Sequence, residues 1–363
     1  MQDSAHILQE MVRQACADKR TLAICGGHSK DFYGHPLAGD RLDTTIHQGI
    51  IEYTPSELVL TARAGTPLKT IEETLTANGQ MLPCEPPYFA GEATFGGMLA
   101  AGLSGPSRPY RAAVQDTVLG CVILNGKGEL LRFGGKVMKN VAGYDLSRLM
   151  VGSLGCLGVI IEATVKVVPK PPAEKSVAFM IDSANATALI NNLRREGLPV
   201  TASAHTGEQL LVRFSAGALE INALEKHLET GYRFVDWQVF QEAGYWQRLR
   251  DHELPFFNTE KAIWRLSTPC LAELTAFIGT DDALLSEWGG ALHWLTTTRD
   301  PDSIFAFMAI CEGHATLFRQ GDSPRAARLF QPLPAIQLQW HRNLKKAFDP
   351  AGIFNPGHMH TEF

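Results

Sequence analysis

The sequence has 363 residues, more than the roughly 250 to 300 at which a single hydrophobic core stops growing, so we expect two domains. Hydrophobic residues make up 45% of the chain and charged residues 20%, which excludes a disordered or fibrous protein. The formal net charge of −5 provides no long-range attraction to DNA, RNA or an anionic membrane. We therefore exclude nucleic acid as a partner.

The N-terminal part of the chain alternates helix and strand patterns. Apolar residues at helical spacing predict a helix over residues 5–17, and the apolar run Thr21–Cys25 predicts a strand that leads directly into the turn Gly26–Ser29. Residues 46–53 and 58–63 follow as two further predicted strands. Short elements of both kinds indicate an α+β fold.

The next helix has clear boundary residues. Thr66 as N-cap and Pro67 at the first helical position predict its start, and Asn78-Gly79 predicts its end. Residues 83–109 are rich in Gly, Pro and small residues; they are too many for one turn and too apolar for a flexible linker. Such a segment usually wraps around another part of the protein or a ligand.

A hairpin and a linker follow. Asn125-Gly126-Lys127-Gly128 lies between predicted strands at 118–124 and 129–133 and predicts the hairpin turn. Lys170-Pro171-Pro172 predicts a linker, because two prolines cannot continue a central strand or helix. Residues 338–348 predict an amphipathic helix near the end of the chain, and we find no internal sequence repeat.

Seven cysteines are scattered along the chain without a C-x-x-C pair, so neither a zinc ribbon nor an iron–sulfur cluster has the closely spaced thiolates that it needs. The odd number also disfavours a disulfide framework. The N-terminus lacks the apolar region of a signal peptide, and no stretch approaches the roughly 20 apolar residues of a membrane span. We expect a reduced, cytoplasmic protein.

Three clusters of small residues are the strongest candidates for a ligand site. In the turn Gly26–Ser29, two residues without Cβ would let backbone N–H groups approach an anion such as a diphosphate, although a plain tight turn is the alternative. The other clusters are Thr94–Gly102 and Gly152–Gly158, and three together indicate a long ligand held by backbone contacts. The pattern does not match a Rossmann or P-loop site. No G-x-G-x-x-G occurs, and Cys121 stands where a Walker A loop needs its first glycine.

These clusters belong to an ordered set of motifs that resembles a known family. The set comprises Gly26–Ser29, Ala93–Gly97, Val114–Gly120, Lys139–Leu146 and Gly152–Ile160. It resembles the FAD-binding domain of the vanillyl-alcohol-oxidase, or PCMH-type, flavoproteins, and Phe348–Gly357 resembles the tail of that family. The resemblance extends over nearly the whole chain to the FAD-binding E subunits of bacterial glycolate oxidases, through the segments Gly79–Pro87, Arg132–Ser153 and Trp288–Leu292.

The resemblance implies a two-subdomain FAD-binding domain over residues 1–170, a smaller α/β cap domain over 171–330, and a segment, 331–363, that returns to the FAD domain. It implies FAD with its pyrophosphate on the Gly26–Ser29 turn and the Gly96-Gly97 turn. We predict non-covalent FAD, with His28 acting through its backbone, while Lys139, Arg108 and Arg111 are either charge partners or surface cations. The predicted cofactor-binding residues are Cys25, Gly26, Gly27, His28, Ser29, Thr94, Gly96, Gly97, Asp116, Gly143, Tyr144, Gly152, Gly155, Gly158 and Ile160.

The second domain departs from the pattern of relatives that oxidise D-2-hydroxy acids. Those proteins carry an H-x-G-D-G-N-x-H stretch that binds a metal and the substrate carboxylate, whereas this chain has the single His314 near the corresponding end. We predict no metal. Arg265 and Arg319 could clamp a small carboxylate, or Arg265 could simply stack on Trp264 at a strand surface. These two arginines and His314 are the candidates for catalysis, and no catalytic base is identified.

The resemblance implies that glycolate, or a similar small 2-hydroxy acid, is oxidised by hydride transfer to FAD within a complex. A chain without a second redox centre needs partners to receive its electrons, which implies an iron–sulfur subunit beside a sister flavoprotein subunit. Attachment to the inner face of the cytoplasmic membrane would come only through these partners. Two alternatives remain: a non-catalytic FAD-holding subunit, which the missing metal motif favours, and a stand-alone FAD-dependent 2-hydroxy acid dehydrogenase.

Overall fold

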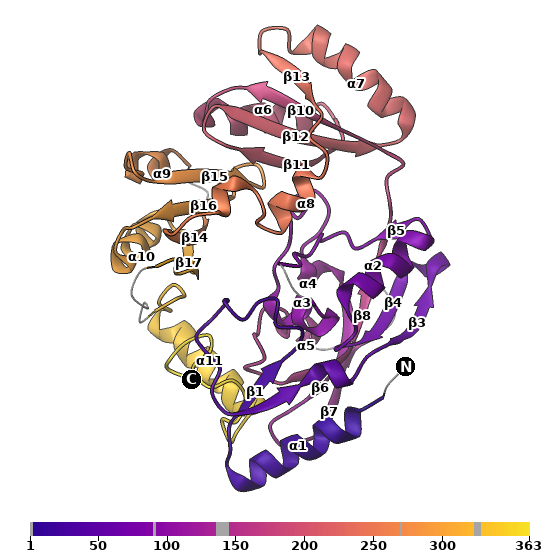
Figure 1. Cartoon of the computed structure of the whole chain (residues 1–363), viewed down its shortest axis with the longest axis vertical. Coiled ribbons are helices and arrows are strands. Elements are labelled where there is room, and N and C mark those ends of the chain that lie inside the picture. The colour runs from indigo at the N-terminus through magenta and orange to yellow at the C-terminus, as the bar shows by residue number, and fades with distance from the viewer. Residues whose placement is uncertain (1–2, 90–91, 136–144, 269–270, 323–327) are drawn as a thin grey trace. The chain divides into compact units, whose positions relative to one another are not determined.

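The computed structural model describes residues 3–89, 92–135, 145–268, 271–322 and 328–363 (Figure 1). The chain separates into two compact units. The first unit contains Met1–Gly105, Ala112–Lys170 and Pro332–Phe363, and the second contains Pro106–Arg111 and Pro171–Gln331. The short segment Pro106–Arg111, which the sequence analysis placed in the first domain, therefore groups with the second unit.

The first unit is built on a five-stranded sheet with the order β3-β4-β8-β6-β7, in which all neighbours are antiparallel. The predicted hairpin between β6 and β7 is confirmed: Asn125 closes its turn by accepting hydrogen bonds through Oδ1 from the N–H groups of Lys127 (3.0 Å) and Glu129 (2.9 Å). The strands are β3 (Ile50–Thr54), β4 (Val59–Arg63), β6 (Val118–Leu124), β7 (Leu130–Gly134) and β8 (Val159–Lys166).

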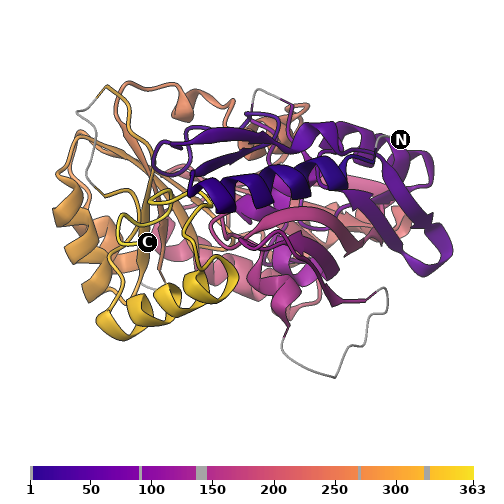
Figure 2. The same ribbon diagram turned by 90° about the horizontal axis from the view of Figure 1, so that it is seen from below.

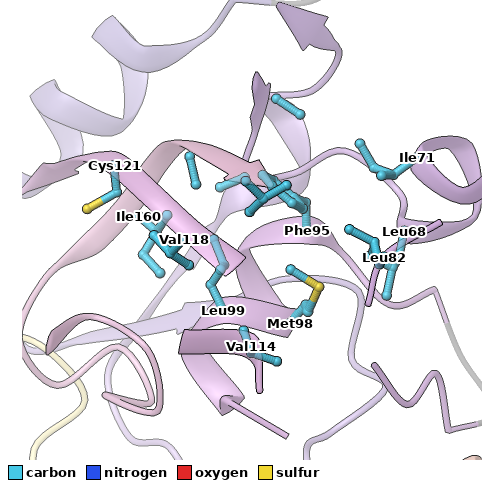
Figure 3. Close-up of a cluster of buried hydrophobic side chains, with 14 of the residues drawn as sticks. Leu68, Ile71, Leu82, Phe95, Met98, Leu99, Val114, Val118, Cys121 and Ile160 are labelled. Atoms are coloured by element: carbon cyan, nitrogen blue, oxygen red, sulfur yellow. The ribbon is translucent and has the colours of Figure 1, made fainter. Parts of the chain in front are cut away.

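Helices cover both faces of this sheet. Side chains alternate along a strand, so Cys121 and Ile123 of β6 enter the core under α2 (Leu68–Ala77) and α3 (Phe95–Ala101), whereas Val122 and Leu124 enter the core under α1 (Ala5–Asp18). Figure 3 shows the former core, in which Phe95 and Leu99 of α3 lie near Val118 and Ile160. The helix α1, indigo in Figure 2, runs along the other face.

The remaining elements of the first unit are short, except for the C-terminal helix α11 (Ala335–Phe348). A parallel pair, β1 (Leu22–Cys25) and β2 (Asp40–Asp43), lies beside the sheet, and β5 (Gln80–Met81) pairs with β9 (Val168–Pro169). Single-turn helices occur at Thr44–Ile46, Pro55–Glu57, α4 (Val114–Thr117) and α5 (Leu146–Leu149). The C-terminal segment, yellow in Figure 1, joins this unit, since Leu22 donates its N–H to the Ile353 carbonyl over 2.7 Å.

Two predicted boundaries in the first unit were wrong for local reasons. The N-cap of α2 is Pro67, because the Thr66 hydroxyl donates instead to the Arg63 carbonyl (2.7 Å) and also accepts from the Gly49 N–H (2.9 Å). The strand predicted from residue 46 begins only at Ile50. Asp43 caps a single helical turn over Thr44–Ile46, which takes Ile46 out of the predicted strand.

The second unit is one eight-stranded antiparallel sheet with the order β13-β10-β12-β11-β15-β16-β14-β17. Its topology repeats: β-α-β-β-α-β occurs twice, and within each copy the strands take the same order in the sheet. The copies join where β11 meets β15, through the residue pairs Ala204 with Glu287 and His205 with Ser286. The two copies share a topology and not a residue pattern, so no internal repeat is visible in the sequence.

The first copy consists of β10 (Ala173–Met180), α6 (Ser183–Arg195), β11 (Val200–His205), β12 (Gln209–Ala216), α7 (Ala218–Gly231) and β13 (Trp237–Phe240). The second consists of β14 (Ala262–Ser267), α9 (Leu271–Phe277), β15 (Ala283–Glu287), β16 (Leu292–Thr297), α10 (Pro301–Ile310) and β17 (His314–Arg319). The helix α8 (Tyr245–Arg250) and a turn at Pro255–Phe257 connect them. In the described part of the chain no helix combines the length and the apolar character that crossing a bilayer requires.

Candidate cofactor site

A cavity of about 480 Å³ lies within the first unit, a size typical of small-molecule and cofactor sites. Its walls come from the end of β1 and the turn after it, the start of α3, the loop before β8, and the C-terminal tail. The structure brings together on these walls most of the residues predicted to bind the cofactor: Cys25, Gly26, Gly27, His28, Ser29, Thr94, Gly96, Gly97, Gly155, Gly158 and Ile160.

Two other predicted residues, Asp116 and Gly152, do not line the described cavity. Asp116 accepts a hydrogen bond from the Ala113 N–H (2.9 Å) and so stabilises the start of α4. Gly152 donates its N–H to the Leu99 carbonyl (3.0 Å) and ties the loop before β8 to α3. The predictions for Gly143 and Tyr144 lie outside the described residues.

The turn after β1 presents hydrogen-bond donors to the cavity. In the part of the chain that the structure describes, the backbone N–H groups of Gly27, His28 and Ser29 have no acceptor within hydrogen-bond distance. His28 takes a left-handed conformation with φ 57°. Successive unpaired N–H groups around a left-handed residue form a concave site for an anion.

The two glycines of this turn are required by packing as well. A Cβ on Gly27 would lie 1.4 Å from the carbonyl oxygen of Glu92, and a Cβ on Gly26 would lie 2.7 Å from Oγ1 of Thr94. The segment that leads into α3 therefore packs directly against the turn. A side chain at either position would displace the turn from the cavity wall.

The first turn of α3 contributes differently from what we expected. Its N–H groups are already bonded within the protein: Phe95 donates to the Thr66 carbonyl (2.9 Å), Gly96 to the Ala64 carbonyl (2.7 Å) and Gly97 to Oγ1 of Thr94 (3.2 Å). The Gly96-Gly97 turn therefore provides a smooth wall, and the donors for an anion are concentrated in the 27–29 turn.

The C-terminal tail braces two walls of the cavity at Asn355. This buried side chain accepts from the Ile24 N–H of β1 through Oδ1 (2.8 Å) and donates through Nδ2 to the Leu154 carbonyl (2.8 Å). Gly155 lies so close that a Cβ there would be 2.6 Å from Nδ2 of Asn355. One amide thus fixes the spacing between β1 and the 152–158 loop.

Comparison with known proteins identifies the cofactor of this chain. Residues 3–134 match a family described as FAD binding domain. The chain is 45% identical over 360 residues to the glycolate oxidase subunit GlcE of Escherichia coli (strain K12), an alignment that covers 99% of this chain and 98% of that one. The chain belongs to the GlcE family. It is an FAD-binding flavoprotein of an oxidoreductase family.

Other relatives share parts of this GlcE-family chain or its fold. The glycolate oxidase subunit GlcD of Bacillus subtilis (strain 168) is 33% identical over 176 residues, which covers 48% of this chain and 37% of that one. Among solved structures, p-cresol methylhydroxylase with substrate bound matches with a TM-score of 0.73 at 13% identity, over 99% of this chain and 88% of that one. This likeness confirms the predicted PCMH-type α+β fold.

The cavity of the GlcE-family chain suits the chemistry of FAD. The 27–29 turn has unpaired N–H donors of the kind that bind a doubly charged pyrophosphate. Two cations that the sequence analysis missed, Lys30 and Arg41, also line the cavity. Lys30 donates to Oγ of Ser29 (3.2 Å), and Arg41 pairs with Asp43 (2.9 Å).

Arg41 was missed because the pairing of β1 with β2 brings it to the cavity, and no local pattern in the sequence indicates that pairing. Of the cations that we had considered, Arg108 and Arg111 belong to the second unit and Lys139 lies outside the described residues. Beside Arg41, burial raises the pKa of the Cys25 thiol, although the guanidinium opposes this shift. Cys25 therefore lines the cavity as a neutral thiol.

The second unit places the predicted arginines on one pair of strands. Arg265 of β14 lies over the ring of Trp288, 5.3 Å from its centroid, and Arg108 lies over the same ring at 4.5 Å. The suggested stacking of Arg265 on Trp264 is wrong, because neighbouring residues of a strand point to opposite faces. Trp264 is fully buried and packs against Phe305 of α10, with ring centroids 5.2 Å apart.

The two other candidates lie on the adjacent strand. In the register of β14 with β17, Arg319 is opposite Ile263 and His314 is opposite Ser267. Burial lowers the pKa of Arg319. Burial also holds the pKa of the nearby His252 well below its usual value, and the positive charges of Arg319 and Arg265 add to this effect. Among the described residues, no group of three or more His, Cys, Asp or Glu side chains is arranged to hold a metal ion.

Proposed function

We propose that this chain is the FAD-binding subunit of a glycolate oxidase that oxidises glycolate, or a similar small 2-hydroxy acid, to the 2-oxo acid within a multi-subunit complex. The observation that carries the proposal is the 45% identity to GlcE over 99% of the chain. The cavity adds independent support, because its backbone donors and two cations suit a dianionic dinucleotide. FAD, when bound, supplies the two-electron acceptor for the hydroxy acid.

The residues of the chain bind and orient this cofactor. The 27–29 turn and Lys30 hold the pyrophosphate, and Asn355 keeps β1 at a fixed distance from the 152–158 loop. No residue of this cavity needs a covalent bond to FAD for these contacts. We therefore expect acid precipitation to release free flavin into the supernatant, whereas yellow colour retained in the pellet would contradict non-covalent binding.

We propose that electrons leave through partner subunits. Among the residues that the structure describes, no cysteine belongs to a cluster of ligands that would hold a second redox centre. An iron–sulfur subunit is the class of partner that would take electrons from reduced flavin one at a time. A GlcD-type flavoprotein is the second partner, and attachment to the cytoplasmic face of a membrane comes through these subunits.

One observation favours a second candidate, in which this chain itself oxidises substrate without help. Arg265 and Arg108 flank Trp288, and Arg319 lies on the neighbouring strand. A planar guanidinium group suits the bidentate recognition of a carboxylate. The second unit lacks the His-rich metal motif, which argues against this candidate. The missing motif favours the opposite alternative, in which the chain holds FAD without oxidising substrate.

Anaerobic titration of the purified chain with glycolate and with D-lactate tests these roles. We expect the chain to carry FAD and the reconstituted complex to reduce an artificial acceptor with glycolate. Bleaching of the flavin in the isolated chain assigns oxidation to this subunit, and bleaching only in the complex assigns it an FAD-holding or electron-relay role. A complex that keeps full activity with a chain unable to bind FAD would overturn the proposal.

A further inference from the structure

His358 is a buried histidine of the C-terminal tail that lines the FAD cavity. Its ring bonds the carbonyl of His35 through Nδ1, and the His35 N–H donates to the His358 carbonyl (2.8 Å). Gly34 packs against the ring as well, since a Cβ there would lie 2.7 Å from Cε1 of His358. These contacts with the loop between β1 and β2 fix the imidazole on the cavity wall.

The bond to His35 determines which ring nitrogen of His358 can meet a ligand. A carbonyl oxygen only accepts hydrogen bonds, so Nδ1 must carry the proton and donate. Nε2 forms no hydrogen bond with any described residue, and it is not among the side-chain nitrogens that are buried without a partner. Nε2 is therefore the ring nitrogen that is available to a ligand in the cavity.

Asp31 connects His358 with the 27–29 turn. Its carboxylate acts on the His358 ring electrostatically and accepts a hydrogen bond from Nδ1 of His28 (2.8 Å), which belongs to that turn. Burial lowers the pKa of His358, and the His35 side chain adds to this effect, whereas the bond to the His35 carbonyl and the charge of Asp31 oppose it. His358 is therefore neutral at pH 7 while no anion lies beside it.

A bound anion would reverse this state. Lys30 and Arg41 also line the cavity, but amine and guanidinium groups are charged throughout the neutral range, whereas an imidazole changes its charge there. A negative charge within about 4–6 Å favours the protonated form of an imidazole. Protonated His358 would offer two N–H donors, Nδ1 to the His35 carbonyl and Nε2 to the anion.

We propose that His358 binds the pyrophosphate of FAD through Nε2 and takes up a proton from solvent when the cofactor binds. The inference rests on the part of the proposed function that assigns the pyrophosphate to the 27–29 turn, and it does not depend on the substrate. It adds one charge-assisted contact from the C-terminal tail to the backbone donors of the turn. By linkage, the affinity for FAD should increase as the pH falls from about 8 to about 6.

The test is calorimetric titration of the full chain, freed of flavin, with FAD in buffers of different ionisation enthalpy, which measures the protons taken up. Within this pH range we expect the wild type to take up as much as about one proton and to bind FAD up to about tenfold more tightly for each unit that the pH falls. Uptake should vanish in His358→Asn, because the amide can still bond the His35 carbonyl but has no atom at the position of Nε2. His6→Asn is the control and should retain wild-type uptake, since His6 is exposed on α1.

A second measurement needs no variant. The phosphorus NMR signals of FAD bound to the wild type should shift with pH as His358 titrates, and signals that do not change would overturn the proposal. FAD binding without proton uptake, or equal uptake by the wild type and His358→Asn, would overturn it as well. Uptake that is lost in His28→Asn and kept in His358→Asn would assign the proton to the turn instead. A wild-type chain that binds no FAD would contradict the cofactor assignment itself.

Discussion

Lys345 shows how one buried charge can organise the cofactor site. Its ammonium group pairs with the Asp349 carboxylate at 2.8 Å while it bonds the carbonyls of Cys156 and Phe354. Asp349 in turn accepts from the N–H groups of Ile353 (3.1 Å) and Phe354 (2.8 Å). The pair thus fixes the tail residues immediately before Asn355. Loss of the pair would therefore displace the Asn355 side chain, which contacts two walls of the cavity.

Lys345→Met should destabilise the first unit strongly. The substitution leaves the Asp349 carboxylate buried without its cation, and losing one partner of a buried pair typically costs about 3–5 kcal/mol. Thermal release of FAD, followed by flavin fluorescence, should therefore occur at a lower temperature. Lys346→Met is the matched control, because Lys346 is exposed and its loss should change the free energy of unfolding by less than about 0.5 kcal/mol. Equal release temperatures for the two variants would contradict the role given to the pair.

His293 makes the second unit sensitive to acid. Burial lowers the pKa of His293 to about 4 from 6.5, and its Nδ1 lies 2.7 Å from Oγ of Ser286. As the pH falls, His293 therefore binds a proton near pH 6.5 in the unfolded state but only near pH 4 in the folded state. The corresponding stability is fully present above pH 6.5, is lost as the pH falls toward 4, and amounts to about 3 kcal/mol.

His293→Asn should remove this contribution. Calorimetric melting temperatures of the variant should fall less steeply than those of the wild type between pH 6.5 and 4, because one proton fewer is bound on unfolding. His6→Asn serves as the control, since His6 is exposed. A pH profile for His293→Asn that runs parallel to that of His6→Asn would contradict the lowered pKa of His293 in the folded protein.

At the scale of the elements, local patterns predicted helices and strands correctly apart from two boundaries, whereas pairings between distant residues were not predicted. The β6–β7 hairpin follows from four adjacent residues, 125–128, and α1 follows from its own apolar spacing. In contrast, the bracing of Ile24 by Asn355 joins residues 331 positions apart, and no local pattern indicates it. Lys345 likewise resembles a surface cation of an amphipathic helix until the tail folds back over it.

The turn after β1 illustrates why recognising a motif does not reveal its physics. The structure places the G-G-H-S turn on the cavity wall with unpaired N–H groups, and its contact with the pyrophosphate stays a prediction. The reason for Gly27, however, is the approach of the Glu92 backbone, which belongs to another part of the chain. Only the three-dimensional arrangement separates a glycine needed for the ligand from one needed for packing.

Gly27→Ala should therefore abolish FAD binding even though alanine is uncharged. Its Cβ would lie 1.4 Å from the Glu92 carbonyl oxygen, so either the turn or the 92–94 segment must move. We expect a folded chain that purifies with less than about a tenth of the wild-type flavin, since losing the donors of one turn costs more than about 1.4 kcal/mol. Gly231→Ala is the control, because a Cβ there meets nothing within 4 Å. Wild-type flavin content in Gly27→Ala would remove this turn from the site.

At the scale of the whole molecule, the FAD unit is assembled from distant parts of the chain. Residues 171–331 form a separate unit inserted between the sheet of the first unit and its C-terminal segment. That segment completes a core, since Phe354 is fully buried and Ile353 is 2% exposed beside Leu22 and Leu42. The second unit, by contrast, draws only Pro106–Arg111 from elsewhere in the sequence.

A chain ending at Gln331 should consequently lose FAD, although it keeps every glycine of the cavity. Without residues 332–363 the core beside β1 opens to water, and β1 loses the bonds from Ile353 and Asn355 that hold it in place. The contacts of the segment are non-covalent, so co-expressing residues 1–331 and 332–363 as separate chains should restore flavin, measured by absorbance after size-exclusion chromatography. The same 332–363 chain carrying Asn355→Ala should restore less, because the Ile24 N–H and the Leu154 carbonyl then lack their partner. Bound FAD in residues 1–331 alone would show that the tail only covers the site and does not build it.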